Sequence, residues 1–169
     1  MTHDHNSPSP FVETWIGKVG GERALDIAMG RGRHAVLLAR HGFRTFGVDI
    51  RHDAVVAARR EDGRIRGWCA DLTKPALPVS AFDLVLVTRY LQRDLFGAIK
   101  AAVKPGGCVI YETFTVAQLA HGTGPRSPDH LLRPGELRSF FADWKVLFYE
   151  EVDAGEAVAR LVAQRSFSA

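Results

Sequence analysis

The sequence predicts an α/β fold in which a doubly wound sheet is covered by helices on both faces. Five strand-length apolar runs alternate with helical segments, and right-handed crossovers between such units place their strands parallel. Two further strand-length runs follow, and the short connection between them, Asp153 to Glu156, contains a glycine that is typical of a hairpin. We therefore expect a mainly parallel sheet that is extended by an antiparallel hairpin.

Each element follows from the spacing of apolar residues. Helices are expected over residues 11–19, 33–41, 53–62, 93–103 and 134–142, the last with a proline at its start. Strands are expected over residues 23–28, 43–48, 64–70, 82–87, 108–113, 144–152 and 157–165. Residues 104–107 are expected to close the fourth helix, and residues 115–133 to form a long loop rich in Gly, Pro and His. The elements make one domain over residues 11–169, preceded by a disordered leader over residues 1–10.

Length and composition favour a globular protein and argue against a membrane-spanning or strongly nucleic-acid-binding one. At 169 residues and 46% hydrophobic composition the chain can bury a core of its own, and its apolar runs are too short to span a membrane. We expect a soluble, cytoplasmic protein in which Cys69 and Cys108 are small buried side chains. The net charge of +3 is small and the arginines are spread over several elements, so there is no strong nucleic-acid signal. The sequence leaves open whether the chain is a monomer or a homodimer.

The turn after the first predicted strand is the strongest functional signal. Here a buried run ends at Ala28, Gly30 and Gly32 follow, and a helix opens at Arg33. Backbone N–H groups at such a helix start bind ligands, and glycines remove the side chains that would block them. A dinucleotide fingerprint would need glycine at positions 28, 30 and 33. Because only position 30 fits, NAD is disfavoured.

The next two strand ends carry acidic residues. Asp49 follows the second strand about 20 residues beyond the glycine turn, the spacing at which an acidic side chain meets a ribose. Asp71 and Leu72 follow the third strand. Each aspartate alone is more typical of a turn or a helix cap. Their joint placement at neighbouring strand ends favours a site for an adenosyl ligand.

Asp26, Ala28, Gly30 and Gly32 resemble the acidic-x-Gly-x-Gly-x-Gly motif of class I S-adenosylmethionine (SAM)-dependent methyltransferases, with Ala in the first glycine position. The resemblance covers residue 11 to the C-terminus and implies a Rossmann-like sheet of seven strands in the order 3-2-1-4-5-7-6, with strand 7 antiparallel. It implies SAM as the cofactor, with Asp71 and Leu72 at the adenine amine. The implied cofactor-binding residues are Asp26, Ala28, Gly30, Gly32, His34, Asp49, Ile50, Asp71, Leu72 and Thr88.

The acceptor side is expected in the loop after the fourth strand and in the long loop. Arg89 and Tyr90 lie in the loop after the fourth strand. This loop lacks the Asn/Asp-Pro-Pro-Tyr/Phe signature of methyltransferases acting on nucleic-acid bases. Tyr111 to Phe114 and the loop over residues 122–137 resemble small methyltransferases of the tellurite-resistance and thiol S-methyltransferase groups. Because long loops are often functional, Arg126 joins Arg89 and Tyr90 as a catalytic candidate. Glu112 is either a base or a structural residue, and the structural role is favoured.

The implied chemistry is an in-line displacement that needs no metal, in which positioning supplies much of the acceleration. A soft anion of sulfur, selenium or tellurium would need cationic side chains but no general base. A small-molecule acceptor of this kind is therefore the leading hypothesis. The alternatives are an RNA or protein methyltransferase and a non-catalytic SAM-binding partner subunit.

Overall fold

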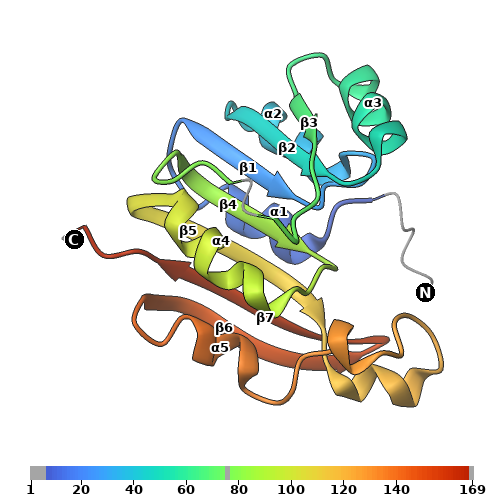
Figure 1. The fold of residues 1–169 in the computed structure, drawn as a ribbon. Helices are drawn as coiled ribbons and strands as arrows, with labels where there is room; N and C mark the ends of the chain where they lie inside the picture. The colour runs from blue at the N-terminus through green and yellow to red at the C-terminus, as the bar shows by residue number, and fades with distance from the viewer. Residues whose placement is uncertain (1–6, 75–76, 168–169) are drawn as a thin grey trace.

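The computed structural model describes residues 7–74 and 77–167. It contains a seven-stranded sheet in the order β3-β2-β1-β4-β5-β7-β6. Strand β7 is antiparallel to both β5 and β6, while β3, β2, β1, β4 and β5 are parallel, so their arrowheads point to the same edge in Figure 1. The expected sheet order and the antiparallel seventh strand are confirmed.

The elements follow the chain in the predicted sequence of types. The strands are β1 (Arg23–Ile27), β2 (Arg44–Asp49), β3 (Arg66–Cys69), β4 (Phe82–Thr88), β5 (Val103–Phe114), β6 (Lys145–Ala154) and β7 (Glu156–Gln164). The helices are α1 (Pro10–Ile16), α2 (Arg33–Arg40), α3 (His52–Glu61), α4 (Phe96–Ala102) and α5 (Glu136–Phe140). Three 3-10 turns complete the set: η1 (Arg93–Leu95), η2 (Val116–His121) and η3 (Pro128–His130).

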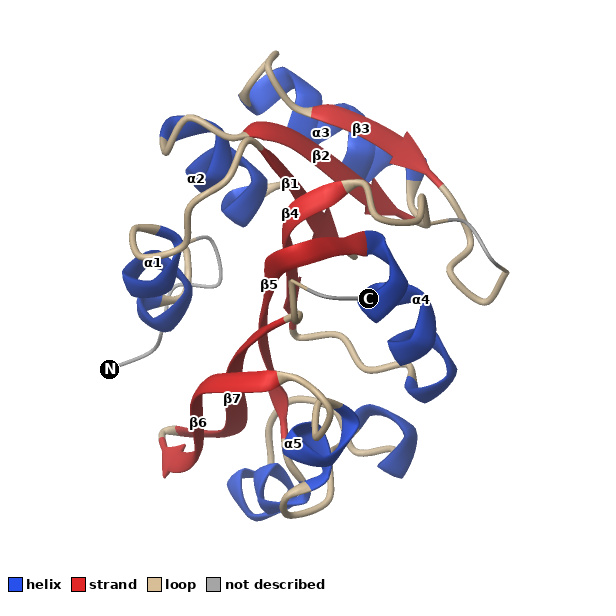
Figure 2. Cartoon of the chain, turned by 90° about the vertical axis from the view of Figure 1, so that its left-hand side faces the viewer, coloured by secondary structure: helices blue, strands red, loops and turns tan. Residues whose placement is uncertain are grey.

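Two helical layers enclose the sheet, with α1, α2 and α3 on one face and α4 and α5 on the other (Figure 2). On the first face, Val12 of α1 and Leu38 of α2 pack against Leu84 and Ile110 of the central strands. The opposite face holds the largest cluster of buried residues, which includes Ile99 of α4 and Phe141 after α5. Because both faces are covered in the centre, β1, β4 and β5 are buried along most of their length.

Tertiary pairing moves several boundaries away from their predicted positions. Strand β5 begins at Val103 instead of residue 108, because Val103 pairs with Phe82 and the backbone of Gly106 and Gly107 bonds to Arg165. The expected helix over residues 134–142 is shorter, since Gly135 takes a left-handed conformation (φ 72°) and the helix starts after it. The long loop over residues 115–133 contains the turns η2 and η3.

The predicted leader is wrong at its C-terminal boundary. Residues 1–6 lie outside the described residues, but Pro10 is the first residue of α1 and the backbone N–H of Ser9 donates to Nε2 of His34 at 2.9 Å. Residues 7–10 are therefore part of the fold. Cys108 is buried as expected, whereas Cys69 is exposed because it ends β3, the strand at the edge of the sheet.

Candidate functional site

The turn between β1 and α2 exposes its backbone at the carboxyl edge of the sheet. Ala28, Gly30 and Gly32 all have positive φ, at 54°, 55° and 87°. A Cβ added to Gly32 would lie 2.6 Å from the Cβ of Ala58, so this glycine lets α2 pack closely on α3. A Cβ added to Gly30 would meet nothing within 4 Å. The backbone at Gly30 therefore faces open space that a ligand can enter.

The ends of β1 and β2 meet through Asp49. Its Oδ2 accepts a hydrogen bond from the N–H of Gly30 at 2.8 Å, and its Oδ1 accepts from the N–H of Arg51 at 2.9 Å. The neighbouring Ile50 is 64% exposed, although it is a large apolar residue. The glycine turn at Gly30, the carboxylate of Asp49 and the exposed side chain of Ile50 thus lie at the same edge of the sheet. The spacing of these residues in the sequence predicts this arrangement.

Asp26 is a buried carboxyl group that lacks hydrogen bonds. It is 1% exposed, and among the described residues neither carboxyl oxygen has a hydrogen-bond partner of normal geometry. Burial raises its pKa to about 8, while the guanidinium of Arg33 and the nearby N–H of Ala35 oppose that rise. A buried carboxyl group without donors is costly. It is suited to a ligand that brings its own N–H donors and positive charge.

Asp71 and Leu72, which follow β3, lie at the same edge of the sheet as the ends of β1 and β2. Oδ1 of Asp71 accepts from the N–H and the Oγ1 of Thr73, at 2.9 and 2.6 Å. Next to it, the carbonyl of Leu72 accepts from Nε2 of Gln92, whose Oε1 accepts from the hydroxyl of Tyr90. Burial raises the pKa of Tyr90, and the carboxylates of Asp94, Asp71 and Asp49 add to the rise. Tyr90 therefore lies close to the acidic ends of both β2 and β3.

Gln92 was not predicted from the sequence. It stands 20 residues from Leu72, and its hydrogen bonds link the loop after β4 to the loop after β3. Nothing in its residue type or its neighbours signals this, because a glutamine in a polar loop is ordinarily solvated.

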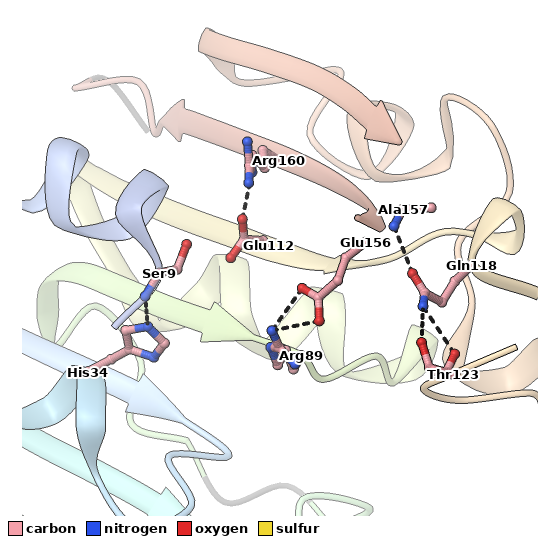
Figure 3. Close-up of polar contacts among 9 residues, drawn as sticks. All are labelled: Ser9, His34, Arg89, Glu112, Gln118, Thr123, Glu156, Ala157 and Arg160. Carbon is pink, nitrogen blue, oxygen red and sulfur yellow. Dashed lines mark hydrogen bonds and ion pairs between the residues drawn. The ribbon is translucent and has the colours of Figure 1, made fainter. Parts of the chain in front are cut away.

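His34 connects three elements and is neutral. Its Nε2 accepts from the N–H of Ser9, so the proton resides on Nδ1, which lies 3.2 Å from Oγ1 of Thr88 (Figure 3). Burial, together with the positive charges of Arg33 and Arg89, lowers its pKa to about 3. Both ring nitrogens are thus engaged within the protein. The predicted contacts of His34 and Thr88 with a cofactor would compete with this linkage.

Arg89 follows β4 and has a backbone conformation that is rare for a residue with a side chain. Its φ is 52°, and one guanidinium nitrogen lies 3.0 and 2.8 Å from the two carboxylate oxygens of Glu156 (Figure 3). The guanidinium also lies over the ring of Phe114, 5.3 Å from its centroid. Left-handed backbone in non-glycine residues is concentrated at functional sites. Glu156, which begins β7, was missed because it is 67 residues from Arg89.

A second ion-pair group continues from this point across the hairpin. Oε2 of buried Glu112 accepts from Nε of Arg160 at 2.6 Å, and Arg160 also bonds to Glu150 at 2.9 Å (Figure 3). Glu112 and Arg160 are cross-strand partners in the β5 and β7 register. This pairing supports the structural interpretation of Glu112, although as a partner within the sheet instead of a loop cap.

The long loop is fastened at two places. Gln118, 1% exposed, donates to the carbonyl and hydroxyl of Thr123 and accepts from the N–H of Ala157 at 2.7 Å (Figure 3). Arg93 forms an ion pair with Glu136 at 2.6 Å and donates to the carbonyls of Pro128, Asp129 and Leu131. The two anchors hold the loop against the hairpin and α5.

Arg126 lies between these two anchors and is exposed. Its guanidinium donates to the carbonyl of Gly122 at 3.3 Å, within the same loop. The structure does not bring it into contact with Arg89 or Tyr90, and its catalytic role stays a prediction. In the same loop His121 pairs with Asp153, and His130 is exposed.

Comparison with known proteins agrees with this geometry. Residues 24–107, which contain the glycine turn and the ends of β1 to β4, match the family model described as a methyltransferase domain. The chain contains a class I, SAM-dependent methyltransferase domain. SAM is accordingly the cofactor that this domain implies, and the buried carboxyl of Asp26 and the open backbone at Gly30 fit its ammonium and its adenosyl part.

Solved structures of this methyltransferase fold are similar over most of the chain. A SAM-dependent methyltransferase from Mesorhizobium loti has a TM-score of 0.76 at 22% identity, over 92% of this chain and 96% of that one. TehB from Haemophilus influenzae has a TM-score of 0.78 at 17% identity, over 98% of this chain and 64% of that one. The methyltransferase domain is therefore similar in fold to the tellurite-resistance group.

A curated relative is longer than this chain. Hemagglutinin 1 from Eikenella corrodens is 28% identical over 163 residues, which are 89% of this chain and 52% of that protein. The chain thus spans about half the length of this relative. No helix among the described residues is long and apolar enough to cross a bilayer, and no three metal-binding side chains gather within that part of the chain.

Proposed function

We propose that this methyltransferase domain transfers a methyl group from SAM to a small anionic acceptor. When bound, SAM supplies a methyl group attached to a positively charged sulfur. The observation that carries the cofactor part of the proposal is Asp26, a buried carboxyl group with no donor of its own among the described residues. A ligand with an ammonium group would satisfy it, and a nicotinamide dinucleotide has none.

Different residues around the cleft would bind different parts of the cofactor. Asp49 has lone pairs left after accepting from Gly30 and Arg51, which suits the two hydroxyls of a ribose. Exposed Ile50 offers an apolar surface to an adenine ring. Oδ2 of Asp71 makes no hydrogen bond with a described residue, so it remains an acceptor for an exocyclic amine.

The acceptor would lie beyond this cleft, at the end of β4, where Arg89 and Tyr90 follow one another. The strained backbone of Arg89 directs its guanidinium to Glu156, and this pair is 27% exposed on each side. Arg33 lies close enough that Arg89 helps burial to lower its pKa. Two neighbouring guanidinium groups favour a negatively charged acceptor, which would bind Arg89 in place of Glu156.

The acceptor class can be tested by an assay that measures S-adenosylhomocysteine release from a panel of acceptors. The panel contains small thiols, selenite and tellurite as anions, and primary amines and a short RNA as comparisons. We expect turnover with one of the anionic acceptors and none with the amines. Turnover of the amines alone would contradict an anionic acceptor, and turnover of RNA alone would favour the RNA methyltransferase alternative.

Arg89 and Glu156 supply matched variants for the same assay. Glu156→Gln removes the competing negative charge and should lower the KM for the anionic acceptor, whereas Arg89→Gln should raise it by about tenfold or more. Neither variant should change the Kd for SAM, which separates acceptor binding from cofactor binding. Tight SAM binding without turnover of any acceptor would favour the alternative of a non-catalytic SAM-binding partner subunit.

A further inference from the structure

We propose that the sheet face formed by β1, β2 and β3, on the side of α4, binds a segment of single-stranded nucleic acid. In this proposal the phosphates bind Arg23, Arg44 and Arg66, and a base packs against Trp68. This surface, which we call the arginine face, is distinct from the cofactor cleft and goes beyond the proposed methyl transfer.

No helix covers this part of the sheet. The chain crosses from β3 to β4 through residues 70–81, and the described residues of that connection, 70–74 and 77–81, form turns without a helix. On this side of the sheet, Figure 2 shows α4 beside β4 and β5 and a loop beside β3, whereas α3 packs on the other face of β3. Phe46 and Trp68, which pack against the edge of the core on this side, remain half-buried. In a doubly wound sheet, an uncovered face of this kind exposes side chains that a helix would otherwise bury.

Three arginines from three neighbouring strands surround one aromatic ring. The guanidinium carbons of Arg23, Arg44 and Arg66 lie 4.9, 5.9 and 5.8 Å from the ring centroid of Phe46. The strand register produces this cluster, because Arg23 pairs with Arg44 and Phe46 pairs with Arg66. The ring orients the three cations, but it neutralises none of them.

No described residue forms an ion pair with the arginines of the arginine face. Within residues 7–74 and 77–167, none of these three arginines forms an ion pair, and Nε of Arg23 is buried without a hydrogen-bond partner. Asp83 is the acidic residue in contact with this strand end, and it accepts from the backbone N–H groups of Glu22 and Arg23 and pairs with Lys104. Neighbouring guanidinium groups without an ion-pair partner favour the binding of an anion from outside the chain, and Arg44 and Arg66 are exposed enough to bind it.

The aromatic residues select single-stranded nucleic acid over an acidic peptide. A hollow of about 430 Å³ lies at the edge strand β3, where Phe46, Arg66 and Trp68 of the arginine face line it together with residues on the α3 side, among them Arg59. Proteins that bind single strands combine a basic groove for the backbone with aromatic side chains on which bases stack. An acidic peptide would use the arginines but would leave Trp68 without a stacking partner. A duplex would offer no unstacked base to it.

The three arginines lie away from the cofactor cleft, whereas Trp68 pairs with Val48, the residue before Asp49. Arg23, Arg44 and Arg66 lie toward the amino ends of their strands, whereas Gly30 and Asp49 lie at the carboxyl ends. Arg23 and Ile27, at the two ends of β1, are four residue steps apart, which is about 13 Å at about 3.3 Å per residue. Changes to the three arginines should therefore leave the Kd for SAM unchanged, so a failure of this proposal is distinguishable from a failure of the proposed methyl transfer.

The test is binding of a fluorescent 12-nucleotide oligouridine RNA to the full chain, measured by anisotropy between 50 and 200 mM salt, with oligothymidine of the same length as a DNA arm. We expect Arg44→Ala with Arg66→Ala to weaken binding at least about tenfold, and to reduce the slope of log K against log salt by about 1.4, at about 0.7 per phosphate contact. The matched control is Arg40→Ala with Arg60→Ala, which removes the same charge from α2 and α3 and should keep the full slope.

Stacking on Trp68 has its own readout. Oligouridine should quench tryptophan fluorescence in the unchanged chain and not in Trp68→Phe, which keeps an aromatic ring in place and preserves the fold. Three outcomes would overturn the proposal: no binding of either oligonucleotide at 50 mM salt, equal loss in the control pair, or a polyglutamate peptide that binds as tightly as the oligonucleotides.

Discussion

The backbone N–H of Gly30 and the Oδ2 atom of Asp49 lie 2.8 Å apart, so the turn after β1 is held by the last residue of β2. The other carboxylate oxygen of Asp49 accepts a hydrogen bond from the N–H of Arg51. One carboxylate therefore fixes the backbone on both sides of the proposed ribose position before any cofactor binds. Such preorganisation reduces the conformational cost of binding.

The variant Asp49→Asn should weaken SAM binding by at least about tenfold, or roughly 1.4 kcal/mol. An amide has one acceptor oxygen, so its NH₂ group would face either the N–H of Gly30 or that of Arg51. Calorimetry with S-adenosylhomocysteine measures the effect. Asp53→Asn, an exposed change in the adjacent helix, is the control and should leave the affinity unchanged. Equal affinity in both variants would place the ribose elsewhere.

Cofactor binding at pH 7 should release close to one proton. Burial raises the pKa of Asp26 to about 8, so without ligand this group is mostly protonated at pH 7. A bound ammonium favours the carboxylate, which expels the proton. Calorimetric enthalpies measured in phosphate and in Tris at the same pH should differ by the difference in buffer ionisation enthalpy. The difference should vanish above about pH 9 and in Asp26→Asn, and a buffer-independent enthalpy at pH 7 would contradict it.

His34 should stay neutral down to acidic pH, with its proton on Nδ1. Its pKa is lowered from 6.5 to about 3, so the folded state binds fewer protons than the unfolded state between these values. Its contribution to stability is therefore complete above about pH 6.5 and is lost progressively as the pH falls toward 3. Nitrogen NMR of the imidazole ring identifies the tautomer and follows the titration. A midpoint above pH 6 would show that the bond from Ser9 does not persist.

Ala28→Gly should stabilise the protein slightly, by about 0.5 kcal/mol. The left-handed backbone at φ 54° costs alanine about 1–2 kcal/mol, while the added glycine loses about 0.5–1 kcal/mol of chain entropy on folding. Urea unfolding measures the net effect. Ala24→Gly, in the regular backbone of β1, has no strain to relieve and should destabilise by more than about 1 kcal/mol. A loss of stability in both variants would mean that the turn does not strain Ala28.

The sheet, and the meeting of the glycine turn with Asp49, were predictable because their signals are local. Strand-length apolar runs, the glycine turn and the aspartates at strand ends can each be recognised within a short window, and chain connectivity rules place them at one edge. Gly30 and Asp49 were placed by residue type and by their separation along the chain, and Asp26 by resemblance to the methyltransferase motif.

The acceptor side was less predictable because its contacts join distant segments. Arg89 was expected to face an acceptor, but its pairing with Glu156 depends on how the C-terminal hairpin adds to the sheet. Strand β5 starts early for the same reason, since Gly106 and Gly107 bond to Arg165 near the other end of the chain. Local propensity favours a turn at these glycines, and pairing with a distant strand overrides it.

The two anchors of the long loop, Gln118 and Arg93, leave residues 124–127 as a short tether between fixed points. Insertions or replacements in this tether would change the chain beside the hairpin without disturbing α5 or the sheet. If Arg126 contacts the acceptor as predicted, changes confined to this segment should alter the acceptor range and leave SAM binding unchanged, and grafted loops would measure this.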